Sequence, residues 1–324
     1  MQNDNKKLAS MRAGFGEGLV IAGEANAQVV GLCADLAEST GMLPFKQKFP
    51  ERYIEVGVAE QNLATVASGM ASMGKIPFMA SYAVFSPGRN WEQIRTTICY
   101  NNLPVKIIGT HAGLNVGPDG GSHQALEDIA LMRSLPRMVV VSPCDAIEAK
   151  KTIIEIAKTN DPTYVRLVRE KSPVITNEEA IFKIGKAQIV YEKNGSKSGS
   201  LASVGIIATG PILYKALMTA KKLTNEGIDV TVMNLSTIKP LDEQAIIKLA
   251  HKTGAIVTVE EHQIHGGMGS AVAECLSTHF PTPIEFVGVK DVFGQSGQSE
   301  ELLELYGLGE KDIYKAIHKV ILKK

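Results

Sequence analysis

The chain has 324 residues, of which 44% are hydrophobic, so it is long enough for two domains with substantial cores. Lys plus Arg and Asp plus Glu both total 34, and this balance gives no global field that would attract nucleic acid or an anionic membrane. The sequence has no apolar run long enough to span a membrane, and its first residues lack the apolar core of an export signal. We therefore expect a soluble, cytoplasmic protein that acts on a small molecule.

The cysteines are scattered and form no Cys-x-x-Cys pair, which argues against a zinc site or a redox dithiol. We expect reduced thiols in the core at all four positions: Cys33, Cys99, Cys144 and Cys275.

The first half of the chain alternates short β-branched runs with helix-period segments, a pattern typical of a parallel sheet covered by helices. The expected strands are Gln28–Leu36, Arg52–Val58, Ile76–Tyr82, Val105–His111, Met138–Ser142 and Thr163–Arg169. The expected helices are Gln61–Met73, Trp91–Tyr100, Ala125–Ser134 and Ala146–Lys158, with Asp145 as the N-cap of the last one.

A second α/β series begins near Leu201, so the fold class is α/β with two domains. Its expected elements are strands Val204–Ala208, Asp229–Asn234, Ala255–Glu260 and Ile284–Val289 and helices Leu213–Asn225 and Asp242–His251. The polar segment Tyr191–Ser200 has turn chemistry and is a loop or a hairpin. We place the domains at 1–182 and 183–324, with a loosely defined boundary near Lys183.

Functional side chains gather where the strands of the first domain end, and this is the edge at which open α/β sheets bind ligands. Each of them alone could be a helix cap or an ordinary polar strand end. Several convergent positions in one domain favour a site. The positions are Asp35, Ser39, Glu60, Tyr82, Phe85, His111, Asp119, His123 and Arg169.

Glu60 stands in EVGVAEQN, directly after an apolar strand and at the mouth of a helix. The helix dipole favours a carboxylate there, so a structural role is one interpretation. The other is a buried carboxyl that shares a proton with a heterocycle nitrogen, which requires a raised pKa. Position alone leaves both open.

The segment His111–Gln124, HAGLNVGPDGGSHQ, is a glycine-rich loop with two histidines and an aspartate. It is weak evidence for a phosphate cradle, and its histidines suit proton transfer better. Arg12 and Arg169 could each clamp a phosphate or carboxylate. GGMGSA, Gly266–Ala271, lacks the third glycine of a dinucleotide motif, so we interpret it as close helix packing.

Taken together, YIEVGVAEQNLATVASGMA, GTHAGLNVGPDGGSHQALEDIALMRSLPRMVVVSPCD and NLSTIKPLD resemble the pyrimidine-binding and C-terminal domains of transketolases. The resemblance covers nearly the whole chain from about Met11. It implies an enzyme that transfers a two-carbon ketol unit from a ketose phosphate to an aldose phosphate with thiamine diphosphate as cofactor.

The resemblance also implies a role for each candidate residue. Glu60 would hydrogen-bond the aminopyrimidine of thiamine diphosphate and promote its imino tautomer, and Phe85 with Tyr82 would pack against that ring. His111 and His123 would contact substrate oxygens and assist proton transfer, and Asp119 would bind a substrate hydroxyl. The sugar phosphate would be bound by Arg12, Ser39 and Arg169. Asp35 would lie near the cofactor.

The chain departs from the family pattern at two places. The loop reads GPDGGSHQ where the family often has GEDGPTHQ, so Pro118 replaces an acid and Gly121 a proline. The stretch Ser86–Asn90 also differs. These departures leave the donor and acceptor sugars open.

The family's metal-binding Gly-Asp-Gly motif, followed by an Asn, has no good match in this chain. The nearest is Asp119-Gly120-Gly121, and the next Asn is Asn160. The resemblance therefore implies no metal site here. An N-terminal transketolase subunit would bind the diphosphate through Mg²⁺ or Ca²⁺, in an α2β2 assembly.

Two other enzymes share this architecture and remain as alternatives: the β subunit of a 2-oxo acid dehydrogenase E1 component and a 1-deoxyxylulose-5-phosphate synthase-like enzyme. His111 with Arg12 and Arg169 favours a sugar phosphate. A non-catalytic assembly protein is a further alternative, which is disfavoured by the joint presence of four residues: Glu60, Phe85, His111 and His123.

Overall fold

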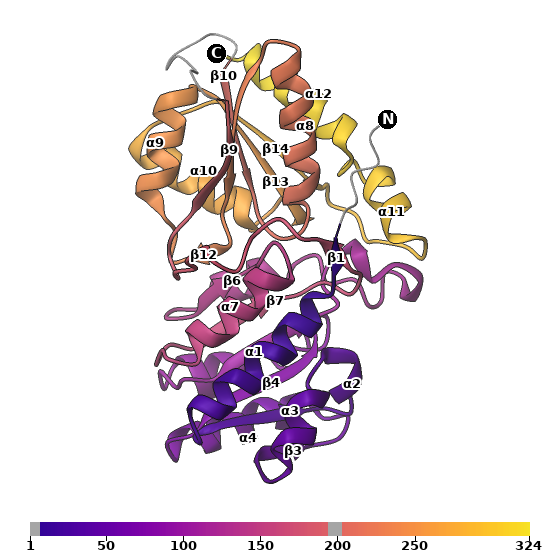
Figure 1. Ribbon diagram of the computed structural model, residues 1–324, viewed down its shortest axis with the longest axis vertical. Helices are drawn as coiled ribbons and strands as arrows, with labels where there is room; N and C mark the ends of the chain where they lie inside the picture. The colour runs from indigo at the N-terminus through magenta and orange to yellow at the C-terminus, as the bar shows by residue number, and fades with distance from the viewer. Residues whose placement is uncertain (1–6, 194–202) are drawn as a thin grey trace.

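The structure is a computed structural model that describes residues 7–193 and 203–324. Figure 1 shows two α/β units stacked along the long axis, with the N-terminal half of the chain in the lower unit. The expected α/β class is confirmed. Within the described residues, no helix combines the length and the apolar character that crossing a membrane requires.

The sheet of the lower unit has the strand order β12-β6-β7-β5-β4-β2-β3. Its strands are β2 (Val29–Cys33), β3 (Tyr53–Glu55), β4 (Ile76–Tyr82), β5 (Lys106–Thr110), β6 (Val139–Val141), β7 (Thr163–Arg166) and β12 (Thr237–Lys239). β12 pairs antiparallel with β6, and the other neighbours pair parallel.

Helices cover both faces of this sheet. The longer ones are α1 (Met11–Ala25), α4 (Glu60–Ser72) and α7 (Ala146–Ile156); the shorter ones are α2 (Ala37–Thr40), α3 (Leu43–Lys48), α5 (Trp91–Gln93), α6 (Asp128–Arg133), the 3-10 helices η1 (Pro50–Arg52) and η3 (Leu114–Asp119), and the π-helix η2 (Ile94–Cys99). Successive residues of a strand point to opposite faces, so Phe78 packs with α1 and α7 while Met79 packs with α4. Burial on both faces is what a parallel sheet requires.

The upper unit repeats this plan with the strand order β14-β13-β10-β11-β9. Its strands are β9 (Gln188–Glu192), β10 (Ser203–Ala208), β11 (Asp229–Asn234), β13 (Ile256–Gln263) and β14 (Ile284–Val289), and its helices are α8 (Leu213–Asn225), α9 (Glu243–Thr253), α10 (Met268–His279), α11 (Ser299–Leu305) and α12 (Glu310–Ile321). β9 pairs antiparallel with β11. The helices α9 and α10 lie on one face, and α8 and α12 on the other (Figure 1).

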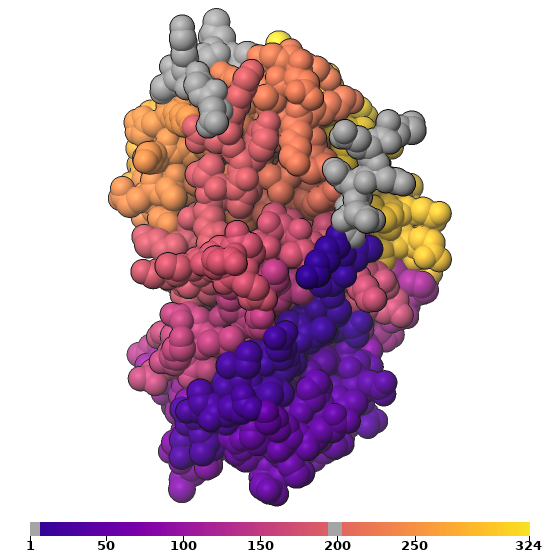
Figure 2. Space-filling model, viewed as in Figure 1, coloured from indigo at the N-terminus to yellow at the C-terminus, as the bar shows by residue number. Residues whose placement is uncertain are grey.

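The two units share structure at their junction. By chain order β12 belongs to the second half, yet it completes the sheet of the first half. One apolar cluster runs from Leu63 of α4 through Met132 to Ile207 of β10. Near the N-terminus, β1 (Leu8–Ala9) pairs antiparallel with β8 (Ser172–Pro173). Figure 2 shows the indigo residues of the N-terminal segment crossing the lower unit up to the junction.

Most expected elements are present, and the differences have local causes. The helix expected at Trp91–Tyr100 is α5 followed by the π-helix η2. The helix expected from Ala125 begins only at Asp128, because Ala125 forms a parallel bridge with Ala112 and its carbonyl accepts from Gly113. Asp145 is the N-cap of α7, as expected, and accepts from the Glu148 amide. Residues 194–200 of the expected loop or hairpin lie outside the described residues.

Two smaller expectations are confirmed. The four cysteines are free and buried. The glycines of GGMGSA pack closely: a Cβ on Gly267 would lie 2.3 Å from Glu260 Oε2, and one on Gly269 would lie 2.7 Å from Thr258 Oγ1. The Met268 and Gly269 amides donate to the Glu260 carboxyl oxygens, so a side chain of the protein already occupies this helix N-terminus.

Candidate active site

The polar strand-end residues of the first domain meet at one edge of its sheet. β7, β5, β4, β2 and β3 are successive neighbours and run parallel, so their carboxyl ends lie on the same side. The side chains that end or follow these strands are Asp35 (β2), Glu60 (β3), Tyr82 (β4), His111 (β5) and Arg169 (β7). This is the edge that the strand pattern predicts for a ligand site.

Four rings from three segments form an aromatic group, which consists of Tyr82, Phe85, His111 and His123. The Tyr82 and His111 rings stack with centroids 3.8 Å apart, and Tyr82 and Phe85 stack at 5.6 Å. The His123 ring meets Phe85 edge-on at 5.4 Å. Tyr82, Phe85 and His123 are half-buried, so the group offers flat surfaces beside two imidazoles.

His111 is held in an unusual environment. It is 2% exposed, and its backbone φ of 54° lies in the left-handed region, which non-glycine residues seldom adopt. Its Nδ1 is 3.0 Å from Thr110 Oγ1. Burial, followed by the positive charges of Arg12 and Arg169, lowers the pKa of His111 to about 3. At neutral pH its imidazole is therefore uncharged and can accept a hydrogen bond.

Glu60 is the first residue of α4 and is 5% exposed. Its carboxylate oxygens each lie 3.2 Å from Nη1 of Arg89, and its backbone carbonyl accepts from Asn90 Nδ2. Arg89 is half-exposed, and its guanidinium lies 4.0 Å from the centre of the Phe85 ring. Glu60 and Phe85 are thus joined through one cation.

Arg89 is a residue of the site that sequence reasoning missed. It stands in Ser86–Asn90, the stretch that departs from the family pattern, and it follows Phe85 by four residues. That spacing is the only signal in the sequence that could have pointed to it.

The three residues expected to clamp a phosphate lie together. Arg12 donates from Nη1 to the Ser39 carbonyl at 2.6 Å and from Nη2 to the Arg169 carbonyl at 3.0 Å, while its Nε is buried without a partner. Arg169 donates from Nη1 to the Val116 carbonyl at 2.9 Å. Both guanidinium groups are therefore held by backbone carbonyls, and Glu170 Oε1 also lies 3.6 Å from Arg169 Nη1. Burial lowers the pKa of Arg12.

The two candidate aspartates are exposed. Asp35 also has a positive φ, 59°, and its amide donates to Glu55 Oε1 at 2.7 Å, which places a second carboxylate beside it. Asp119 ends η3 in the glycine-rich loop, where Gly113, Gly117 and Gly120 take positive φ values. These glycines allow the tight path of the loop.

Three comparisons identify the family. Residues 7–174 match the model of the transketolase pyrimidine-binding domain, and residues 199–313 match that of the transketolase C-terminal domain. The chain belongs to the transketolase family, whose enzymes depend on thiamine diphosphate.

The relatives point to the subunits of split transketolases. The chain is 42% identical to a putative transketolase C-terminal section of Methanocaldococcus jannaschii over 97% of its length and 96% of that protein. It is 39% identical to the 6-deoxy-6-sulfo-D-fructose transketolase subunit SqwH of a Clostridium species over 92% and 90% of the two chains. Among solved structures, the inactive beta4 tetramer of a split-gene transketolase is 42% identical, with a TM-score of 0.88 over 97% and 98% of the chains.

The residues at this edge fit one half of thiamine diphosphate. A half-buried Phe85 ring offers a stacking surface for a pyrimidine, and the buried Glu60 carboxylate offers a hydrogen-bond partner for a ring nitrogen. The other half of the cofactor needs a divalent metal. In the described part of the chain no group of three or more His, Cys, Asp or Glu side chains could hold one.

The nearest sequence match to the metal motif is not assembled in space. Asp119 follows the carboxyl end of β5. The residues on either side of Asn160 contact Lys106 at the amino end of the same strand, since Lys106 Nζ donates to the Thr159 and Asp161 carbonyls. Asp119 and Asn160 therefore lie at opposite edges of the sheet.

Proposed function

We propose that this chain is the C-terminal subunit of a two-chain transketolase that transfers a two-carbon ketol unit from a ketose phosphate to an aldose phosphate. The observation that carries this proposal is the juxtaposition of the buried Glu60 carboxylate, the Phe85 ring and the neutral His111 at one sheet edge. The names of the relatives support the split organisation.

Thiamine diphosphate, when bound, supplies a carbon nucleophile that accepts the two-carbon unit as the ketose is cleaved. This chain would hold its aminopyrimidine: Phe85, with Tyr82, packs against the ring, and Glu60 shares a proton with a ring nitrogen. Asp35 lies at the same edge and would contact the cofactor. Phe85, Tyr82 and Asp35 would orient the cofactor, and Glu60 would also promote its imino tautomer.

The histidines act on the substrate. A neutral His111 would accept a hydrogen bond from a substrate hydroxyl as the ketose carbon–carbon bond breaks, and its lowered pKa makes full protonation of the ring unfavourable. His123 reaches the same space from the loop and would assist on the neighbouring oxygen. Asp119 would bind a hydroxyl and select its stereochemistry.

Arg12 and Arg169, with Ser39, would bind the phosphate of the sugar. Two cations fixed within one cluster suit a tetrahedral dianion, and the buried Nε of Arg12 still has a proton to donate. Pentose phosphate metabolism in the cytoplasm is the proposed setting.

The partner would be an N-terminal subunit that binds the diphosphate through Mg²⁺ or Ca²⁺, in an α2β2 assembly. On this proposal the single chain is inactive, because it can hold only the pyrimidine end of the cofactor. The partner gene can be recognised by its Gly-Asp-Gly motif.

The test is to coexpress the two chains and to measure ketol transfer between sugar phosphates with thiamine diphosphate and Mg²⁺. We expect transfer by the pair and none by either chain alone. A matched control for changes at the site is Glu301→Gln, which alters an exposed carboxylate in α11.

Three results would contradict the proposal. Robust transfer by the purified single chain would exclude the split organisation. Decarboxylation of 2-oxo acids without ketol transfer would favour the dehydrogenase alternative. Full activity of a Glu60→Ala pair would remove Glu60 from cofactor activation.

A further inference from the structure

The loop that carries Asp119 and His123 lies between the two domains. We call residues 111–124 the histidine loop. Its own domain holds its first residues through the Ala112 amide, which donates to the Leu167 carbonyl, and through the stacking of His111 on Tyr82. Arg169 Nη1 also donates to the Val116 carbonyl, and the Glu170 amide donates to Asn115 Oδ1 at 2.6 Å. Further contacts come from the C-terminal domain.

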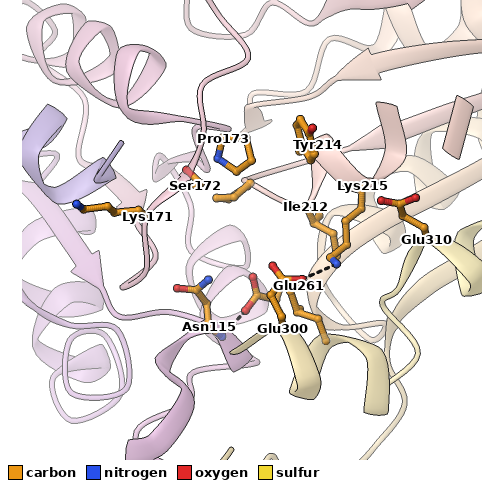
Figure 3. A pocket seen from close by; sticks show the side chains of 12 residues that line it. Asn115, Lys171, Ser172, Pro173, Ile212, Tyr214, Lys215, Glu261, Glu300 and Glu310 are labelled. Atoms are coloured by element: carbon orange, nitrogen blue, oxygen red, sulfur yellow. Dashed lines mark hydrogen bonds and ion pairs between the residues drawn. The ribbon is translucent and has the colours of Figure 1, made fainter. Parts of the chain in front are cut away.

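The first of these contacts is made by Glu261 of β13. Its Oε1 accepts from the Asn115 amide at 2.6 Å, and Glu261 is 4% exposed. A Cβ on Gly113 would lie 2.3 Å from the same oxygen, so the loop backbone approaches this carboxylate as closely as a glycine allows. Figure 3 shows the Glu261 carboxylate directed toward the backbone of Asn115 from the other domain, where both residues line a pocket of about 140 Å³.

The second contact is made by Ser299, the first residue of α11. Its hydroxyl donates to the Asn115 carbonyl at 2.9 Å. The amide and the carbonyl of Asn115 are therefore both bound by the C-terminal domain. A Cβ on Gly117 would lie 3.0 Å from the Ser299 hydroxyl, which brings the middle of the loop against the same side chain.

The third contact is made by Gly294–Ser296 at the other end of the loop. Gln124 is buried, and its Nε2 donates to the Gln295 carbonyl at 3.1 Å. A Cβ on Gly121 would lie 2.5 Å from the Gly294 carbonyl oxygen. Asp119 and His123 stand between the first two contacts and this third one.

We propose that Glu261, Ser299 and the segment Gly294–Ser296 position the histidine loop, so that the C-terminal domain sets the placement of Asp119 and His123 against the substrate. This inference rests on the proposed function. Misplacement of a binding group by a fraction of an ångström weakens its contribution, and buried supporting contacts prevent such misplacement. The C-terminal domain binds the loop on both sides of the two site residues: it binds the backbone of Asn115 on one side and the side chain of Gln124 on the other.

The first experiment measures the loop without any activity assay. Amide hydrogen exchange is followed in the full single chain for Ser299→Ala, Glu261→Ala and Glu261→Gln. The Asn115 amide donates to Glu261, and the His123 amide donates to the Gly120 carbonyl. We expect both amides to exchange about fivefold faster in Ser299→Ala and Glu261→Ala, the effect of losing one hydrogen bond, while β10 is unchanged.

Two controls accompany this measurement. Glu261→Gln keeps an oxygen acceptor of the same shape and should restore most of the protection of the Asn115 amide. Ser277→Ala removes an exposed hydroxyl that binds only the Glu274 carbonyl within α10, and it should leave the loop unchanged. If Glu261→Ala does not fold, Ser299→Ala still decides the question.

The second experiment uses the coexpressed pair. In Ser299→Ala the KM for the sugar phosphate should rise about fivefold or more, while the affinity for thiamine diphosphate, measured by calorimetry, stays within about twofold. An unchanged KM with unchanged exchange would overturn the inference. So would a parallel loss of cofactor affinity, which indicates general destabilisation. A pair without any ketol transfer would overturn the proposed function, whereas the exchange result would still decide whether the C-terminal domain holds the loop.

Discussion

The two sheets of this molecule have the same kind of edge and use it differently. In the first domain, the carboxyl ends of the strands carry Glu60, Tyr82 and His111, which are proposed to bind ligands. In the second domain, the corresponding ends carry Asn234, Glu260 and Glu261, and these side chains bind protein groups. Asn234 donates to Glu148, Glu260 binds the start of α10, and Glu261 binds the histidine loop.

The difference shows that a polar side chain at the carboxyl edge of a sheet does not by itself form a ligand site. The second edge faces the first domain, and its polar groups bind that domain or, in the case of Glu260, the start of α10. The pKa shifts have opposite directions and the same cause: burial lowers the pKa of His111 to about 3 and raises the pKa of Glu261 to about 7. Both groups are thereby disposed toward their uncharged forms.

The same substitution at each edge gives the sharpest comparison, and Glu60→Gln should have the largest effect. In the coexpressed pair, Glu60→Gln should lower ketol transfer by about 100-fold or more, because the amide cannot share a proton with the pyrimidine. The measurement is kcat with saturating thiamine diphosphate. Near-wild-type turnover would mean that this edge does not serve the cofactor.

Glu261→Gln should act on stability instead. The Glu261 carboxyl has a pKa of about 7 in the folded chain and about 4.5 when unfolded, so the folded state binds more protons between these values. The wild-type chain should therefore lose stability relative to the variant as pH rises from 5 to 8, by roughly 2 to 3 kcal/mol. Urea unfolding of both chains at the two pH values measures this difference. The groups that face Glu261 are Arg166, Glu300 and Asp128, and they are present in both chains.

His111→Gln should show the reverse dependence on pH. The imidazole has a pKa of about 3 when folded and 6.5 when unfolded, so the unfolded state binds more protons between these values. The wild-type chain should lose about 2 kcal/mol of stability relative to the variant as pH falls from 7 to 5. A parallel loss in both chains would show that His111 is not the group responsible.

The smallest effect is expected at the contact between the two regions. In Gly294→Ala the new methyl group would lie 1.8 Å from Gln124 Oε1, so the Gln124 side chain must move and its bond to the Gln295 carbonyl would be lost. We expect the KM for the sugar phosphate in the pair to rise about threefold to tenfold with little change in kcat. An unaltered KM would show that the segment Gly294–Ser296 does not position His123.

Sequence reasoning predicted the elements and the edge well, because both follow from local patterns. β4, α8, β11 and β14 have the predicted bounds. The sequence predicted that Glu60 and His111 lie at the same sheet edge, because parallel strands end on one side of a sheet. Sequence reasoning missed α1, because the apolar and glycine-rich N-terminal segment has a weak helical period. It also gave no reason for Arg89 to pair with Glu60, because that ion pair depends on the path of a loop.

Contacts between residues far apart in the chain were beyond that reasoning. The bond from Ser299 to Asn115 joins positions 184 residues apart, and β12 pairs with a strand about a hundred residues earlier. The alternation of apolar and polar residues along a strand indicates its register within a sheet. A single sequence does not indicate which distant segment will pair with the edge strand.

The placement of β12 limits how relatives of this protein can be recombined. A chimera that joins the first half of this chain to the second half of another subunit would bring a foreign segment against β6, where Thr237 pairs with Val141 and Lys239 with Val140. Expression of the first half alone would leave the β6 edge, which is all valine, open to pairing with other chains. Successful exchanges should therefore carry the Thr237–Lys239 segment together with the half of the chain that it completes.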